Sequence, residues 1–263
     1  MKMTSGSSAP VCVSVVIPIF NGAMTIEKAL DSVLIQDVPL EIIMVDDGSS
    51  DDTLQTVSPY LDLPNVHLLI NKTNMGAAAS RNRGVRAASG RYIAFLDCDD
   101  WWEPEKLKKQ LRLLKKTGYV LCATGRRLVS ESGEDTGTVI GVSRKLTYKD
   151  LFFQNPINCS SVLIERRAAV MFPMENDRQA HEDYIMWMKV LRHFKYGCAV
   201  NEPLLNYRVS RNGKSGSKVK SALMTINVYR YMGFGPLKSL FCFAAYSVNG
   251  VIKYYINPLL RRQ

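Results

Sequence analysis

The chain has 263 residues, and its 46% hydrophobic and 22% charged content is typical of a folded protein with a sizeable core rather than of a disordered chain. The net charge of +10 is unevenly placed. The stretch from Pro203 to the C-terminus holds ten basic residues and no acidic one, which leaves 24 basic and 24 acidic residues before it. A nucleic-acid-binding domain would carry positive charge on the domain itself, so we expect no nucleic acid partner.

The cysteines and the N-terminus indicate a cytoplasmic protein. Six cysteines are scattered along the chain without a Cys-x-x-Cys pair, which is typical of reduced, mostly buried thiols rather than of disulfides or a zinc site. Residues 1–10 are rich in serine and lack the apolar stretch of a secretory signal.

Between residues 11 and 130, short apolar runs alternate with helical patterns. This alternation predicts an α/β fold with a mostly parallel sheet and flanking helices, built of βαβ units. The expected strands span Cys12–Ile17, Leu40–Val45, Val66–Ile70, Arg91–Leu96 and Tyr119–Thr124. The expected helices span about Met24–Gln36, Thr53–Tyr60, Ala77–Ala88 and Glu105–Lys116.

After residue 125 the pattern is less regular. We expect a hairpin over Arg127–Ile140 and, after Thr147 as an N-cap, a short helix that ends at Phe153. Further along the chain we expect a strand over Ser160–Ile164, a helix over His181–Phe194 and extended chain over Leu204–Val209.

Three carboxylates directly follow the apolar run Ile93–Leu96, namely Asp97, Asp99 and Asp100. Packing does not explain acids at the end of a core strand, because burying an unpaired charge is costly. At the carboxyl end of a parallel strand, carboxylates can hold a divalent cation that in turn holds phosphate oxygens. A solvated, Asp-rich turn is the alternative for one such motif taken alone.

A second acidic strand end follows Leu40–Val45. There Asp46 and Asp47 can accept hydrogen bonds from a base or a ribose. The nearby Asp51 and Asp52 are better explained as caps of the next helix.

Small residues surround Arg81 in the segment 74–84, so that its side chain could reach a nucleotide. The chain has neither the Gly-x-x-x-x-Gly-Lys-Ser/Thr of a P-loop nor a Gly-x-Gly-x-x-Gly after the first strand. These absences exclude a P-loop and argue against a dinucleotide-binding fold.

His181-Glu182-Asp183 begins a predicted helix with two acids in its first turn. One explanation is the favourable interaction of acids with the helix dipole. The functional explanation is that Asp183 is a general base beside a cleft. Position 185 is Ile, so the zinc motif His-Glu-x-x-His is absent.

Five motifs occur in one order along the chain: Ser14–Asn21, Val45–Ser49, Asn74–Gly84, Phe95–Asp100 and Glu182-Asp183. This series resembles the inverting glycosyltransferases of family 2 with the GT-A fold, of the small type used in bacterial polysaccharide and lipopolysaccharide biosynthesis. The resemblance covers residues 11–210, which we expect to be the catalytic domain. Residues 218–263 would form a separate, basic helical tail.

The resemblance implies transfer of a sugar from a nucleotide-sugar, most often UDP-linked, to a hydroxyl of a glycan or of a polyprenyl-diphosphate-linked acceptor. It implies that Asp99 ligates Mg²⁺ or Mn²⁺ and that Asp183 is the general base of a single inverting displacement. The nucleotide contacts that it implies come from Pro18, Phe20, Asp46, Asp47, Arg81 and Asp97.

One position departs from the family pattern. Many relatives read Tyr-Arg-x-His-x-x-Ser-x-Ser, whereas Ser210 stands here in place of the His. Arg208, Arg211 or Lys214 would then neutralise the diphosphate instead. The Gln-x-x-Arg-Trp of processive synthases is absent, so we expect addition of a single sugar.

The tail predicts two helices, Lys218–Met232 and Leu237–Ile256. The second is uncharged only from Ser239 to Ile252, well short of the ~20 apolar residues that a spanning helix needs. Basic residues beside aromatic and aliphatic ones favour contact with an anionic membrane surface, at the inner face of the bacterial cell membrane. Packing of both helices on the catalytic domain is the alternative.

Two other functions stay open from the residues alone: a nucleotidyltransferase of similar α/β layout, and a non-catalytic basic module at the membrane surface. The first would be expected to carry a Gly-rich loop with Lys or Arg after the first strand, and Phe20–Ala23 is not such a loop. The second should not bind a nucleotide.

Overall fold

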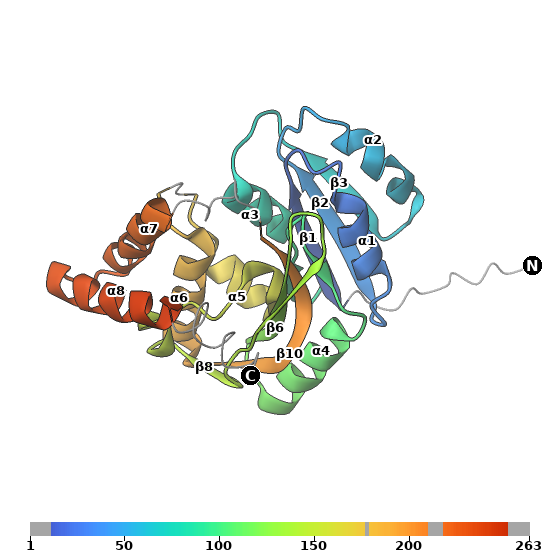
Figure 1. Ribbon diagram of the computed structural model, residues 1–263. Coiled ribbons are helices and arrows are strands. Elements are labelled where there is room, and N and C mark those ends of the chain that lie inside the picture. Colours follow the sequence, from blue (N-terminus) through green and yellow to red (C-terminus); the bar gives the residue numbers. More distant parts are fainter. Residues whose placement is uncertain (1–11, 177–178, 210–217, 252–263) are drawn as a thin grey trace, which may run out of the picture.

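The computed structural model describes residues 12–176, 179–209 and 218–251 and has an α/β architecture, with a curled sheet flanked by helices (Figure 1). The strands are β1 (Val13–Ile19), β2 (Leu40–Asp46), β3 (Val66–Ile70), β4 (Tyr92–Phe95), β5 (Trp101–Trp102), β6 (Leu121–Val129), β7 (Asp135–Ile140), β8 (Lys145–Thr147), β9 (Leu163–Glu165) and β10 (Tyr196–Arg208). Within the described residues they form one sheet of order β3-β2-β1-β4-β9-β6-β10-β5, with β7 beside β6 and β8 beside β10.

The helices that cover this sheet are α1 (Ile26–Leu34), α2 (Thr53–Val57), α3 (Ala77–Ala87), α4 (Lys106–Thr117), α5 (Arg166–Met171) and α6 (Glu182–Phe194). Two more, α7 (Lys218–Tyr231) and α8 (Pro236–Val251), follow β10. Short 3₁₀ turns are η1 (Ser58–Asp62), η2 (Asp150–Phe152) and η3 (Cys159–Ser161).

The parallel strands β1, β2, β3 and β4 contribute alternate side chains to two cores. Val15 and Ile17 join the core formed with α1 and α4. Val16 and Ile43 join the core formed with α3, α5 and α6. Strands buried on both faces read as continuous apolar runs, and the sequence-predicted strands and helices of this half are confirmed. The predicted helix from Thr53 is interrupted near Pro59, because proline has no N–H to continue it.

The second half departs more from the expected pattern. The predicted hairpin is confirmed as β6–β7, whose turn includes Gly133 with φ +87°. β10 begins well before the predicted Leu204, and its register shifts around Pro203, a residue that disfavours a strand assignment from sequence. β8 and α5 had no sequence prediction.

Two predicted elements are shorter than expected. Thr147 and Asp150 do cap each other reciprocally, but only the 3₁₀ turn η2 follows. The strand predicted from Ser160 begins after η3, a turn capped by Asn158, whose side chain accepts from the Ser160 N–H.

The tail helices α7 and α8 pack against the rest of the chain through an aromatic cluster beside η2 and α6. Tyr229 stacks on Phe234 at 5.8 Å between ring centroids, and Phe234 meets Phe152 edge-on at 5.0 Å. Tyr229 also lies 6.4 Å from Tyr184 of α6. One face of each tail helix is therefore part of the core, and no helix in the described part of the chain is long and apolar enough to cross a membrane.

Lys106, in the first turn of α4, is completely buried. Its Nζ lies 3.8 Å from the centre of the Trp102 ring and donates to Gln110 Oε1 at 3.0 Å. Burial removes the hydration of this ammonium group and lowers the pKa of Lys106 to about 7.

We expect this group to make stability pH-dependent. Between pH ~7 and the ordinary lysine range the unfolded chain binds a proton that the folded chain does not, so the unfolding free energy should rise by about 1.4 kcal/mol per pH unit. Lys106→Met should lack this pH-dependent contribution. In urea unfolding, the free energy of unfolding of the wild type should therefore rise relative to that of the variant as pH rises. Lys116→Met, at an exposed site on the same helix, is the control. A wild-type minus Lys106→Met difference that does not change with pH would contradict the assignment.

Candidate functional site

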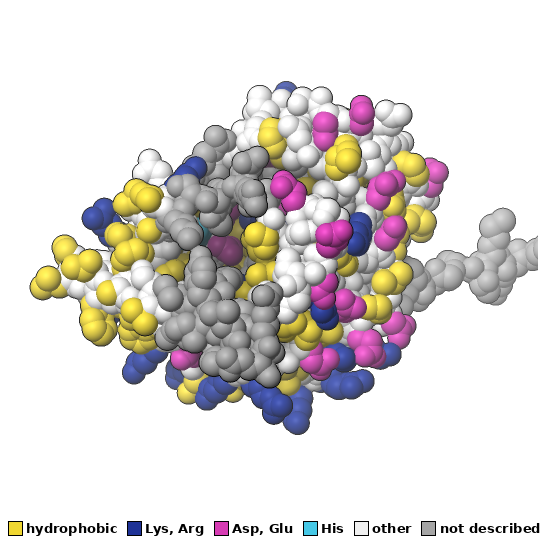
Figure 2. Space-filling model, in the orientation of Figure 1, with side chains coloured by type: hydrophobic (Ala, Val, Ile, Leu, Met, Phe, Trp, Pro, Cys, Tyr) yellow, Lys and Arg dark blue, Asp and Glu magenta, His cyan; other side chains and the backbone are white. Residues whose placement is uncertain are grey.

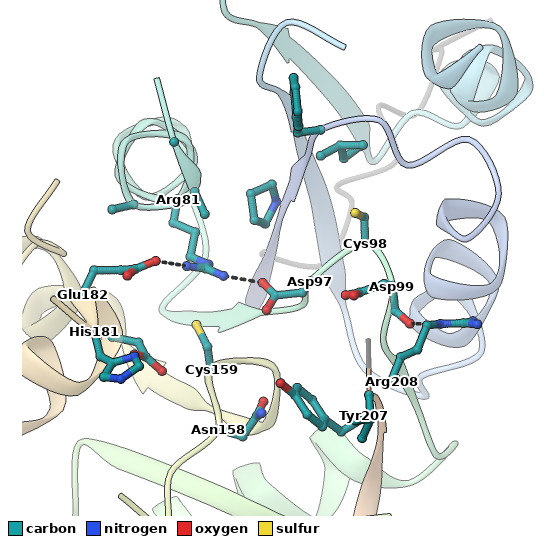
Figure 3. Close-up of a pocket in the computed structure, with 18 of the residues that line it drawn as sticks. Arg81, Asp97, Cys98, Asp99, Asn158, Cys159, His181, Glu182, Tyr207 and Arg208 are labelled. Carbon is teal, nitrogen blue, oxygen red and sulfur yellow. Dashed lines mark hydrogen bonds and ion pairs between the residues drawn. The ribbon is translucent and has the colours of Figure 1, made fainter. Parts of the chain in front are cut away.

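A cleft of about 1520 Å³ opens where the parallel strands end. Side chains from both halves of the chain surround it (Figure 3). It is lined by seven of the eight site residues expected from the sequence, namely Pro18, Phe20, Asp47, Arg81, Asp97, Asp99 and Asp183. The eighth, Asp46, is buried and does not line the cleft.

The end of β1 forms one wall of the cleft. Pro18 is accommodated inside the sheet because β4 has already ended at Phe95, so no strand needs its missing N–H. Phe20 follows and is 48% exposed. Asn21 next to it adopts φ +52° and accepts a hydrogen bond from the Ser50 N–H at 2.9 Å. This bond ties the loop after β1 to the loop after β2.

Asp46 and Asp47 have different roles. Asp46 Oδ2 accepts from the N–H groups of Gly48 and Ser49, both at 3.2 Å, and so shapes the turn after β2. Asp47 accepts from the N–H groups of Met75 at 3.0 Å and Gly76 at 2.7 Å. It therefore positions the start of α3 while also lining the cleft.

Arg81 is only 6% exposed and connects the two sides of the cleft. Its guanidinium forms an ion pair with Asp97 at the end of β4 and another with Glu182 at the start of α6, the latter at 3.5 Å (Figure 3). Burial alone would lower the pKa of Arg81, but these carboxylates outweigh it and hold that pKa well above its usual value. The geometry makes Arg81 a bridge between the β4 loop and α6.

The acidic loop after β4 brings three carboxyl groups close together. Burial, followed by the charge of Asp97, raises the pKa of Asp99 to about 6. Asp100 lies deeper, and burial together with Asp99 raises its pKa as well. Asp100 Oδ1 accepts from the Arg208 N–H at 2.9 Å, whereas its buried Oδ2 has no hydrogen-bond partner among the described residues. A cation bound in the cleft beside Asp99 would stabilise the ionised form of these carboxyl groups.

The donor set fits a nucleotide-bound cation better than a closed metal site. The described part of the chain contains no group of three or more His, Cys, Asp or Glu side chains arranged to hold a metal. Mg²⁺ usually takes one or two protein carboxylates and completes its shell with phosphate oxygens and water. The cleft offers this number of carboxylates. Asp99 lines its wall, and Asp97 lies close enough to raise the pKa of Asp99.

Arg208 at the end of β10 holds the acidic loop in place. Its Nε donates to the Asp99 carbonyl at 3.0 Å, and its guanidinium also donates to the Glu131 carbonyl in the β6–β7 turn. Ser210, Arg211 and Lys214, the other positions of the departing motif, lie outside the described residues.

The start of α6 forms the wall opposite β1. Asp183 lines the cleft, and its Oδ1 accepts from the Tyr184 N–H at 2.7 Å. Burial, followed by the charge of Glu182, raises the pKa of Asp183. A carboxylate with raised basicity at a cleft is suited to accept a proton. The residue before the two acids, His181, lies with its Nε2 3.3 Å from the Ser221 carbonyl of α7.

Several further lining residues had no sequence prediction. Asn158, the N-cap of η3, and Cys159, the first residue of η3, come from a segment without a recognisable motif. Lys220 and Ser221 of α7 and Tyr246 of α8 line the cleft from the tail, for which the sequence offered membrane contact or packing on the catalytic domain but no cleft residue. Pairing of distant segments, rather than any local pattern, brings these side chains to the cleft.

Comparison with known proteins places the chain among sugar-transferring enzymes. Residues 14–171 match the family described as glycosyl transferase family 2. A Bacillus subtilis glycosyltransferase named for teichuronic acid biosynthesis, TuaG, is 35% identical over 244 residues, which cover 92% of this chain and 96% of the relative. The Escherichia coli UDP-Glc:alpha-D-GlcNAc-diphosphoundecaprenol beta-1,3-glucosyltransferase WfaP is 30% identical over 245 residues, covering 92% and 95%.

Solved structures share the fold at low sequence identity. Staphylococcus aureus TarS in complex with UDP-GlcNAc superposes with a TM-score of 0.71 at 18% identity, covering 93% of this chain and 73% of that one. The mannosyltransferase PcManGT from Pyrobaculum calidifontis, in complex with GDP-Man and Mn²⁺, gives 0.65 at 19% identity, covering 96% and 74%. The GT-A fold expected from the sequence is confirmed.

Proposed function

The chain belongs to glycosyl transferase family 2 and is a glycosyltransferase, and from that premise we propose that it transfers one sugar from a UDP-linked donor, with inversion, to a hydroxyl of a lipid-linked glycan acceptor. Family membership decides against both alternatives, the nucleotidyltransferase and the non-catalytic membrane module. The observation that carries the proposal is the cleft, which places Asp99 and Asp183 on opposite walls with Arg81 between them.

The donor half of the proposal rests on the wall formed by the strand ends. Phe20 offers an exposed ring on which a base can stack, and Asp47 offers a carboxylate beside it. Asp97 lies at the junction between this wall and the acidic loop, held by Arg81. WfaP and a second Escherichia coli relative, WfgD, are both named as using UDP-Glc, which supports a uridine donor here.

The chemical half rests on Asp183. In a single displacement the acceptor hydroxyl attacks the anomeric carbon from the face opposite the leaving diphosphate, and a base removes its proton. The raised pKa of Asp183 increases its basicity, and its place on the wall away from Asp99 suits attack from the opposite face. A bound Mg²⁺ or Mn²⁺, held by Asp99, would neutralise negative charge on the departing diphosphate.

The acceptor and the location follow from the relatives and the tail. Both Escherichia coli relatives are named for an acceptor on diphosphoundecaprenol, a lipid confined to a membrane. We assign catalysis to residues 11–210 and membrane contact to residues 218–263, at the inner face of the bacterial cell membrane. Such a protein would act from the cytoplasm on an acceptor anchored in the bilayer.

A donor screen tests the proposal directly. Slow hydrolysis of nucleotide-sugars without acceptor, measured as release of free nucleotide across UDP-, GDP- and dTDP-linked sugars with Mn²⁺, should be greatest for one or more UDP-sugars. Preference for a GDP- or dTDP-sugar would overturn the uridine assignment, and hydrolysis of none of them would count against the transferase site proposed here.

Asp99→Ala should remove the metal dependence of donor binding. In the wild type, calorimetry should show UDP binding that strengthens when Mn²⁺ is added, because Asp99 would hold the cation and the cation would offset the negative charge of the diphosphate. In the variant that strengthening should disappear. Asp62→Ala, at an exposed aspartate of η1 that does not line the cleft, is the matched control. UDP affinity that stays equally Mn²⁺-dependent in Asp99→Ala would remove Asp99 from the metal site.

A further inference from the structure

The tail helix α8 carries an exposed apolar stripe along its whole described length. Five exposed residues fall within an arc of about 100° on a helix of 3.6 residues per turn; these residues, called the outer stripe below, are Leu237, Leu240, Phe241, Ala244 and Val248. Leu237 is 85% exposed, Leu240 63% and Val248 60%. Figure 2 shows hydrophobic side chains gathered along this helix, without acidic ones among them.

The opposite face of α8 already packs against the rest of the protein. The outer stripe is therefore not the face by which α8 contacts the core. Ser239 and Cys242 are buried on that face, and Tyr246 reaches the cleft. The neighbouring helix α7 repeats the arrangement, with Met224 and Val228 buried. Its outward face holds an apolar pair and a basic residue, namely Val219, Leu223 and Arg230, all exposed. Both helices are thus anchored on one side and apolar on the other.

Charge identifies what covers this surface. No acidic residue occurs anywhere after Glu202, whereas ten basic residues do. Arg230 lies at the end of α7, and Lys238 lies in the first turn of α8 with its Nζ 3.9 Å from the Phe234 ring centre. An apolar stripe flanked by cations and free of acids matches an anionic lipid leaflet, where the stripe enters the acyl boundary and the cations meet phosphate groups.

The same two helices form part of the cleft. Lys220 and Ser221 of α7 and Tyr246 of α8 line it, and the Ser221 carbonyl contacts His181 beside the proposed base Asp183. The surface that would meet the bilayer and the wall that would meet the acceptor are therefore built from the same helices.

From this arrangement we infer that α7 and α8 are a membrane-docking hairpin that sets the cleft against an anionic bilayer, with the outer stripe immersed. Docking in this way delivers a diphosphate-linked lipid to the Asp183 side of the cleft while the donor enters from the cytoplasmic side. This inference rests on the proposed transfer to a lipid-linked acceptor. It adds the face that contacts the lipid and the direction from which the acceptor arrives.

Vesicle flotation tests the docking face. The full-length protein should float at low salt with vesicles made of equal parts phosphatidylcholine and phosphatidylglycerol, and much less with phosphatidylcholine alone. In the triple variant Leu237→Ser, Leu240→Ser, Val248→Ser the affinity for these vesicles should fall roughly tenfold or more. The substitutions remove apolar surface that the outer stripe would bury in the bilayer. Since all three side chains are exposed, the variant should fold and hydrolyse donor like the wild type.

Matched exposed leucines elsewhere supply the control. Leu54→Ser, Leu61→Ser and Leu63→Ser, at exposed positions in and after α2 and η1, should leave vesicle binding unchanged when combined. Arg230→Gln should weaken binding to the anionic vesicles and reduce its salt dependence. A triple variant of the outer stripe that floats as well as the wild type would overturn the inference. So would a wild type that forms a dimer by light scattering and becomes a monomer in that variant, because a second copy would then cover the stripe.

Two readouts separate this inference from the proposed function. Transfer to a lipid-linked acceptor in vesicles should fall in parallel with vesicle binding in the outer-stripe variant, while transfer to a short soluble acceptor should not. If transfer to the soluble acceptor works but vesicle binding does not depend on the stripe, the docking face is wrong and the glycosyltransferase proposal stands. If vesicle binding depends on the stripe but no sugar is transferred to either acceptor, the docking face is right and the proposed transfer reaction is wrong.

Discussion

Asp183→Asn should cut turnover by a factor of roughly 10² to 10⁴, the usual contribution of a general base, while leaving UDP affinity close to that of the wild type. The amide keeps the shape of the side chain and can still accept the hydrogen bond from the Tyr184 N–H. It cannot accept the acceptor's proton. Binding and chemistry should therefore separate, with binding measured by calorimetry and turnover by sugar transfer.

The pH dependence offers an independent check. Because burial and Glu182 raise the pKa of Asp183, the acidic limb of kcat in the wild type should lie at higher pH than for an ordinary carboxylate, with activity lost as pH falls and the base is protonated. This limb should be absent from the residual activity of Asp183→Asn. Stability should not fall in the variant, because a neutral amide avoids the cost of burying a charge.

The neighbouring acid supplies the comparison. Glu182 pairs with Arg81, so Glu182→Gln should lower the free energy of unfolding as well as activity. Should Asp183→Asn turn over like the wild type while a correctly folded Glu182→Gln is inactive, the base has been assigned to the wrong member of the pair.

The parallel half of the fold could be predicted because local pattern and tertiary structure agree there. β1 and β2 are buried on both faces, so they read as apolar runs, and cleft residues follow them directly, Phe20 after β1 and Asp47 after β2. β10 could not be predicted in full because Pro203 interrupts it at a shift in register. The strand predicted from Ser160 exists only as the shorter β9, because η3 takes up the start of that stretch, and a turn of this length is too short for any periodicity to reveal.

The site shows the same division. Residues at strand ends, such as Asp99, could be predicted because a strand delivers whatever follows it to the carboxyl edge of the sheet. The bridge through Arg81 could not, because Asp97 and Glu182 lie far from it and from each other along the chain. The contribution of the tail to the cleft was likewise invisible, since it depends on how α7 packs beside α6.

The second large effect expected is on stability and concerns that bridge. Arg81→Gln should lower the free energy of unfolding by about 3 to 5 kcal/mol, the usual result of removing one partner from a buried ion pair. Glu182, whose side chain is 8% exposed, would lose the cation that offsets its burial, and Asp97 would lose it too. Urea denaturation with intrinsic tryptophan fluorescence, which reports on Trp102 and Trp187 in the core, measures the change.

Arg86→Gln is the matched control, because Arg86 lies exposed near the end of the same helix and its substitution should cost no more than about 0.5 kcal/mol. Arg81→Lys should restore only part of the lost stability, since one ammonium cannot reproduce the planar guanidinium that serves two carboxylates at once.

UDP affinity and turnover should both fall in Arg81→Gln. Arg81 holds Asp97, on the proposed donor side, and Glu182, beside the proposed base, at a fixed distance from each other. If the free energy of unfolding of Arg81→Gln equals that of Arg86→Gln, hydration by water rather than pairing with Arg81 stabilises these two carboxylates. A loss of stability with unchanged turnover in the folded fraction would make the bridge purely structural.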